Sequence, residues 1–197
     1  MARKLTRRPI TLALAALAGF ALAAVATAQP ARPAVAPTAY GLTFDGLITD
    51  HVALQSYAGK VILVVNTASH CGYTPQYAGL QALYTELAPQ GLVIVGVPSG
   101  DFHEQELGTA KEIAAFCRLN YGVTFPMAAK YHVIGAEAHP FYRWAQASLG
   151  ESAVPRWNFH KILIGRDGRA IAAFPSATKP DDPAFRAAVQ AALAAHA

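Results

Sequence analysis

Residues 61–97 read VILVVNTASHCGYTPQYAGLQALYTELAPQGLVIVGV. The two ends of this stretch, 61–65 and 92–97, are short, continuous apolar runs rich in β-branched residues. Such runs are typical of strands that are buried on both faces of a sheet. Between them Thr74 suits a helix cap and Pro75 a first helical position, and large side chains then recur at helical spacing: Tyr77, Leu80, Leu83, Tyr84 and Leu87. The stretch therefore predicts a β-α-β unit.

Two further helices have clear start signals. The sequence from Thr109 to Glu112 is a capping-box pattern, and we expect its helix to run to about Asn120, before Gly122. A last helix should begin where Asp181 or Asp182 can cap Pro183, and it places apolar side chains on one face: Phe185, Val189 and Leu193.

Two hairpins complete the predicted elements. The first pairs 161–165 with 169–174 around an Asp167-Gly168 turn, and the second lies within 43–54. The order β-α-β, α, β-β-α is that of an α/β protein with a thioredoxin-like fold, in which helices flank a central sheet. The residues from 39 to 197 suffice for one such domain.

The N-terminus has the three-part pattern of an export signal. A basic start is followed by an apolar run from Ile10 to Ala26 and by a small-x-small cleavage site that ends at Ala28. Residues 1–28 are thus predicted to be a signal peptide, and the Pro/Ala-rich residues 29–38 a tether. An uncleaved membrane anchor is the alternative, and the Arg pair at 7–8 leaves both the general and the twin-arginine export routes open. Either route predicts an exported, periplasmic protein.

The positive charge of the chain belongs to this signal. Four of the 16 Lys and Arg residues, and none of the 12 Asp and Glu residues, lie in residues 1–28. The remaining chain therefore has no net charge, and nothing in its composition indicates a nucleic-acid partner.

Cys71 is one of two cysteines in the chain and follows the first buried strand, just before a helix start. The helix dipole and free backbone N–H groups favour a thiolate at such a position. Thr74 stands where a C-x-x-C motif would have its second cysteine, so this is not a dithiol redox site. A lone thiolate can attack an O–O bond and become a sulfenic acid. An inert, buried cysteine is the alternative.

Cys117 is the other thiol with which a sulfenic acid could condense to form a disulfide. It shares a helix face with Ile113 and Phe116, so ordinary core packing is an alternative role. A disulfide requires Cα atoms within about 7 Å, and a resolving role for Cys117 therefore implies local unfolding of its helix.

The chain resembles the glutathione peroxidase family. Five ordered motifs carry the resemblance, from about Tyr40 to the last helix: NTASHCGYTPQYAGL (66–80), FHEQELG (102–108), EIAAFCRLNYGVTFPM (112–127), HPFYRWA (139–145) and RWNFHKILIGRDG (156–168).

The resemblance implies a set of catalytic residues. The family's peroxidatic position falls on Cys71, its Gln on Gln105, and its Trp-Asn pair on Trp157 and Asn158. The resolving cysteine of the thioredoxin-dependent subgroup falls on Cys117. An indole N–H and side-chain amides can donate hydrogen bonds to a thiolate and to a leaving oxygen. Taken singly, Trp157 would be interpreted as a packing residue, Gln105 as a loop residue and Asn158 as a turn residue.

The chain departs from the family pattern at three places. Ser99 replaces an additional cysteine within P-S-G-D-F (98–102). His103 and Leu107 replace a Gly and a Pro on either side of Gln105, which raises the question of whether that loop sits as it does in the family. His70 replaces the usual Lys before the reactive residue, and we expect it to face solvent.

The leading hypothesis is a thiol peroxidase that acts on hydrogen peroxide and organic hydroperoxides, needs no cofactor or metal, and is recycled by a thioredoxin-like protein or by glutathione. A thiol-disulfide oxidoreductase on the same fold and a copper-binding module that uses Cys71 and His70 are the alternatives. The resemblance also implies a monomer, because the short link from Leu149 to Arg156 lacks the extra loop that is associated with tetrameric relatives.

Overall fold

The computed structural model describes residues 38–195. The predicted signal peptide, and the predicted tether apart from Thr38, lie outside these residues. Within residues 38–195, no helix has the length and apolar character needed to cross a membrane.

A mixed four-stranded sheet in the order β4-β3-β5-β6 forms the centre of the domain. Strand β3 (Val61–Thr67) pairs in parallel with β4 (Leu92–Pro98), and antiparallel with β5 (Lys161–Ile164) on its other side. Strand β6 (Ala170–Phe174) closes the sheet antiparallel to β5. The β-α-β unit predicted from residues 61–97 is therefore confirmed, because the two fully buried apolar runs lie side by side in the sheet.

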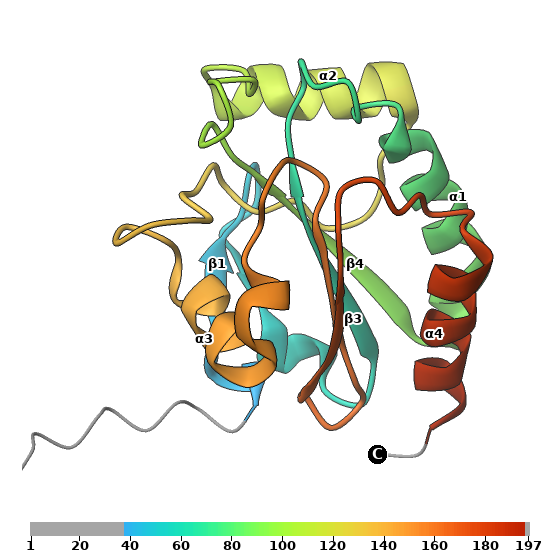
Figure 1. The fold of residues 1–197 in the computed structure, drawn as a ribbon. Helices are drawn as coiled ribbons and strands as arrows, with labels where there is room; N and C mark the ends of the chain where they lie inside the picture. The colour runs from blue at the N-terminus through green and yellow to red at the C-terminus, as the bar shows by residue number, and fades with distance from the viewer. Residues whose placement is uncertain (1–37, 196–197) are drawn as a thin grey trace, which may run out of the picture. The chain divides into compact units, whose positions relative to one another are not determined.

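Helices cover both faces of this sheet (Figure 1). The helices are α1 (Gln76–Leu87), α2 (Ala110–Tyr121), α3 (Pro140–Leu149) and α4 (Pro183–Ala194), with short 3-10 turns at Ala39–Gly41, Leu54–Tyr57, Ala88–Gln90 and Gly150–Ala153. Alternate residues of β3 point to opposite faces. Val61, Leu63 and Val65 pack with α1, α2 and α4. Ile62 and Val64 pack with α3 and with the hairpin of β1 (Thr43–Asp45) and β2 (His51–Ala53).

The capping and turn signals read from the sequence are confirmed. Thr109 and Glu112 form a reciprocal capping box at the start of α2, and Gly122 ends the helix with φ 62°. Asp182 caps α4 by accepting the backbone N–H groups of Ala184 and Phe185. Gly168 has φ 78° in the turn between β5 and β6, a conformation that glycine adopts without strain.

Two expectations about helices were incomplete. Thr74 does not cap α1, because its hydroxyl is used in the preceding loop; Pro75 is the N-cap and α1 begins at Gln76. Helix α3 is an element that the sequence signals do not predict, although residues 139–145 form one of the motifs that carry the family resemblance. His139 caps it by accepting the Phe141 N–H, and Pro140 occupies its first position.

Candidate active site

The loop between β3 and α1 holds Cys71 through the side chain of Thr74. The Thr74 hydroxyl accepts the Cys71 backbone N–H at 2.9 Å and donates to the Ala68 carbonyl at 2.9 Å. The Tyr73 backbone N–H points at the Cys71 sulfur, 3.4 Å away. Cys71 is 7% exposed and forms no disulfide. The threonine that excludes a C-x-x-C motif thus fixes the geometry of the loop that carries the thiol.

Asn66, the sixth residue of β3, ties this strand to the segment that carries Trp157 and Asn158. Its side-chain amide donates to the Trp157 carbonyl at 3.1 Å, and its side-chain oxygen accepts the His160 N–H at 3.0 Å. Its backbone carbonyl accepts the Phe159 N–H at 2.6 Å. Asn66 is 1% exposed, so these bonds lie in the interior and fix the 157–160 segment beside the strand that leads to the thiol.

Gln105 and Asn158 are hydrogen-bonded to each other. The Asn158 amide donates to Gln105 Oε1 at 3.0 Å, and the Gln105 backbone carbonyl accepts the His70 N–H at 2.9 Å. The first bond occupies the Gln105 side-chain oxygen and leaves its amide N–H groups as donors. The structure therefore brings Gln105 and Asn158 together next to the residue that precedes Cys71, despite the changes at His103 and Leu107.

Trp157 lies partly buried beneath the same loop. Its ring is 5.6 Å from the Phe102 ring and 5.2 Å from the His103 ring, measured between centroids. His103 and Glu104 have φ 59° and 51°, so this loop makes a left-handed turn at two residues that are not glycine. Within residues 38–195 the Trp157 indole N–H has no hydrogen-bond partner, which leaves it available as a donor.

Glu106 is a buried acid that is not among the site residues predicted from the sequence. One carboxylate oxygen accepts the backbone N–H of Ser69 at 3.2 Å, that of Leu107 at 2.8 Å, and the Ser69 hydroxyl. Burial raises the pKa of this carboxyl above its usual value. Glu106 thus joins the loop of Gln105 to the loop of Cys71. No pattern in the sequence distinguishes it from an exposed loop glutamate.

Cys117 lies in α2 with its side chain in the core, 2% exposed and free. It shares that core with Ile113 and Tyr77. Burial raises the pKa of its thiol to about 11. His70 is exposed, as expected, and its ring lies 6.3 Å from that of Phe116 on the same helix. The start of the Cys71 loop and α2 are therefore neighbours, although the two thiols are unpaired.

Lys161 is a fully buried lysine beside this site. Its ammonium donates to Gln76 Oε1 at 2.6 Å and to the Thr178 carbonyl. Burial lowers the pKa of Lys161 to about 7. Gln76 is the first residue of α1, so this contact fastens β5 to the helix that follows the Cys71 loop. Among residues 38–195, no three His, Cys, Asp or Glu side chains are grouped so that they could hold a metal ion.

A thioredoxin-like fold that carries one cysteine at a strand-helix junction, close to amide donors, defines a class of thiol enzymes without a dithiol motif. Comparison with known proteins gives the family. The glutathione peroxidase profile matches residues 39–146, and the chain belongs to this family. It is a glutathione peroxidase-like peroxidase, which confirms the predicted peroxidase activity. The identity of its reductant stays a prediction.

Individual relatives agree with this assignment. Hydroperoxy fatty acid reductase gpx1 of Synechocystis sp. is 43% identical over 153 residues, which cover 74% of this chain and 90% of that protein. Glutathione peroxidase-like peroxiredoxin gpx1 of Schizosaccharomyces pombe is 47% identical over 125 residues, covering 62% and 79%. The solved structure of Trgpx in apo form superposes with a TM-score of 0.65 at 32% identity, covering 81% of this chain and 97% of that one. The predicted thioredoxin-like fold is confirmed.

Proposed function

We propose that this peroxidase is an exported monomer with a two-cysteine cycle, in which Cys71 reacts with the hydroperoxide and Cys117 resolves the product. The observation that supports the first step is the Gln105–Asn158 hydrogen bond beside the Cys71 loop, because it leaves the Gln105 amide N–H groups free to donate to a peroxide at Cys71. Such preorganised, uncharged donors stabilise the charge that develops on a leaving oxygen.

In the first step the Cys71 thiolate attacks one peroxide oxygen and the O–O bond breaks. The departing alkoxide or hydroxide takes up a proton and leaves as alcohol or water, and Cys71 becomes a sulfenic acid. Gln105 and the Trp157 indole N–H donate to the leaving oxygen. Asn158 orients Gln105 and does not itself need to reach the peroxide.

In the second step the Cys117 thiol condenses with the sulfenic acid. The S–S bond forms, the S–O bond breaks, and the hydroxyl leaves as water with the Cys117 proton. Cys117 is buried in the interior of α2, so this helix must open before the two sulfur atoms can meet. A thioredoxin-like dithiol protein then reduces the disulfide, in preference to glutathione.

We extend the substrate range to organic hydroperoxides, including those of fatty acids, because a 43% identical relative is named a hydroperoxy fatty acid reductase. The basic start, apolar run and cleavage site in residues 1–28 support export to the periplasm. Recovery of a mature protein that begins at Gln29 would support this location, whereas an intact N-terminus in the cytoplasm would contradict it.

The test compares three proteins with thioredoxin and with glutathione as reductants. Wild type should lose two hydrogens from its intact mass after one equivalent of peroxide and should turn over with thioredoxin. C71S should lose all turnover. C117S should consume the first equivalent at the wild-type rate, stall as a sulfenic acid, and pass to sulfinic acid with excess peroxide. Wild-type turnover of C117S with thioredoxin would assign Cys117 to packing alone.

A further inference from the structure

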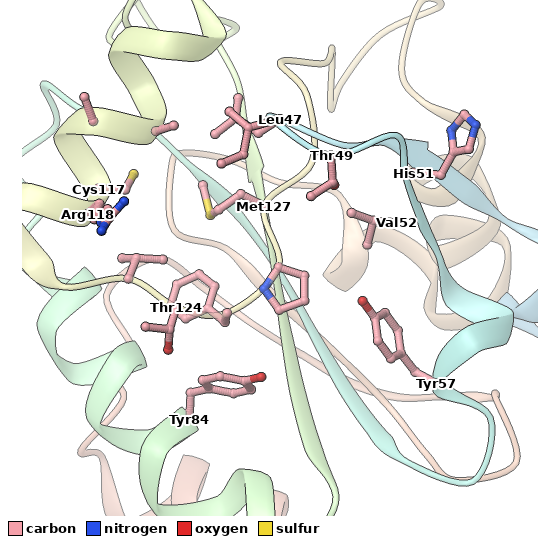
Figure 2. Close-up of a pocket in the computed structure, with 16 residues that line it drawn as sticks. Leu47, Thr49, His51, Val52, Tyr57, Tyr84, Cys117, Arg118, Thr124 and Met127 are labelled. Carbon is pink, nitrogen blue, oxygen red and sulfur yellow. The ribbon is translucent and has the colours of Figure 1, made fainter.

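A cavity separate from the residues of the proposed peroxide site lies against α2. It has a volume of about 620 Å³ and is bounded by α1, α2, the loop after α2 and the β1–β2 hairpin. Cys71, Gln105, Trp157 and Asn158 do not line it. Figure 2 shows Cys117 and Arg118 on its α2 wall, with Tyr84 and Tyr57 on α1 and the segment after β2. The cavity therefore contacts the proposed resolving cysteine without being part of the peroxide site.

The cavity wall is apolar and aromatic, and it has one unpaired cation. Leu47, Phe125 and Met127 are typical of its lining, and Ile48 at its edge is 76% exposed. Arg118 is exposed, and within residues 38–195 its guanidinium has no hydrogen bond or ion pair.

Other charges do not compete with Arg118. The remaining basic side chain in the lining is that of His51. Its Nδ1 lies 3.5 Å from Asp45 Oδ1, and Figure 2 shows its ring turned away from the cavity. Among the described residues that line the cavity there is no aspartate or glutamate. The cavity thus combines a mainly apolar lining with one unpaired positive charge among the described residues.

We propose that this cavity binds the chain of a linear fatty acid, with the carboxylate on Arg118 and the hydrocarbon tail among the apolar side chains. Its volume lies within the roughly 300–1,000 Å³ that small-molecule sites have in proteins. A guanidinium matches a carboxylate in both charge and shape, and the bonds between them are among the stronger hydrogen bonds. The apolar wall buries the hydrocarbon tail, and the unpaired Arg118 binds an anionic head group.

The bound acid controls the second step of the cycle, and this consequence rests on the proposed role of Cys117. A ligand that contacts α2 only in its helical form stabilises that form against opening. By linkage, the open population falls by a factor of one plus the ratio of ligand concentration to Kd. At ten times Kd, disulfide formation should slow about tenfold, while the reaction of Cys71 with peroxide stays unchanged.

Binding is tested by calorimetry on the reduced protein with dodecanoate as the probe. We expect one saturable site, and about fourfold weaker binding for each methylene removed from the tail. Dodecyltrimethylammonium has the same tail and a positive head, and should bind at least tenfold more weakly. R118Q should weaken dodecanoate binding about tenfold. K111Q is the matched control, because it removes a cation from the same helix outside the cavity.

Three binding results would overturn the proposal: no saturable binding, equal binding of the two head groups, or an unchanged affinity in R118Q.

The effect of the ligand on disulfide formation is followed by single-turnover mass spectrometry at a dodecanoate concentration of ten times Kd. Slower disulfide formation in wild type, with relief in R118Q, supports control. Unchanged disulfide formation contradicts control of this step by the ligand. If dodecanoate instead competes only with thioredoxin for the protein, the cavity is a protein-docking surface. Failure of the two-cysteine cycle itself is distinct, because then no disulfide forms at any ligand concentration while calorimetry is unaffected.

Discussion

Removal of the α2 capping box should speed disulfide formation if helix opening limits the second step. Thr109 Oγ1 accepts the Glu112 N–H at 3.2 Å, and Glu112 accepts the Thr109 N–H at 3.0 Å. Replacing a threonine N-cap with alanine typically costs about 1 kcal/mol of helix stability. That loss corresponds to an approximately fivefold larger open population of α2. T109A should therefore form the disulfide about fivefold faster than wild type.

The assay mixes reduced protein with one equivalent of hydrogen peroxide, blocks remaining thiols at set times and follows the loss of two hydrogens by intact mass. Sulfenic acid formation at Cys71 should be the same in T109A and wild type. D182A is the matched control, since it removes the side-chain cap of α4, which does not carry a cysteine. Its rate of disulfide formation should equal that of wild type.

One result would refute the reasoning. Hydrogen exchange should show faster opening of residues 113–121 in T109A. If exchange accelerates there while disulfide formation does not, the resolving step does not depend on opening of α2. Equal acceleration in D182A would instead indicate a general loss of stability.

Two further predictions concern the interior of the site. W157F removes an indole donor and should lower the second-order rate constant with peroxide about a hundredfold, measured by stopped flow; an unchanged rate would make Trp157 a packing residue. K161M should change how stability depends on pH. The pKa of Lys161 is about 7 when folded and about 10.4 when unfolded, so burial of the charge costs most below pH 7 and the cost declines as pH rises above 7. The stability advantage of K161M over wild type, from urea unfolding, should shrink by about 2 kcal/mol between pH 7 and pH 9. The exposed K179M should show no such trend, and parallel profiles for K161M and wild type would mean that Lys161 stays charged in the fold.

Most of the fold was predictable because its signals are local. The runs in β3 and β4 are long enough and apolar enough to indicate buried strands, and caps such as Thr109 lie within four residues of the groups they satisfy. Helix α3 begins at His139 and Pro140, and a histidine cap is not one of the usual start signals. Thr74 was misread for a related reason, since its hydroxyl can bond either a helix N–H or the loop before it.

In the candidate active site, only the residues that match the motifs of the glutathione peroxidase family could be predicted from the sequence. Asn66 acts through hydrogen bonds to residues more than 90 positions away in the sequence, and Glu106 through bonds to Ser69 across 37 positions. No local pattern encodes such partners, because they depend on how β3, β5 and the 102–108 loop come together. These two buried polar residues hold the loops that carry Cys71, Gln105 and Trp157.

The different surroundings of the two cysteines also set the order of the proposed steps. A thiol with a pKa of about 11 is a thiolate in only about one molecule in ten thousand at pH 7, and Cys117 is 2% exposed besides. We therefore do not expect peroxide to react first with Cys117. Cys71 lies instead in a loop where a backbone N–H points at its sulfur and where Gln105 and Asn158 meet. Opening of α2 removes the burial that keeps Cys117 protonated, so the same motion that brings it toward Cys71 also makes it a better nucleophile.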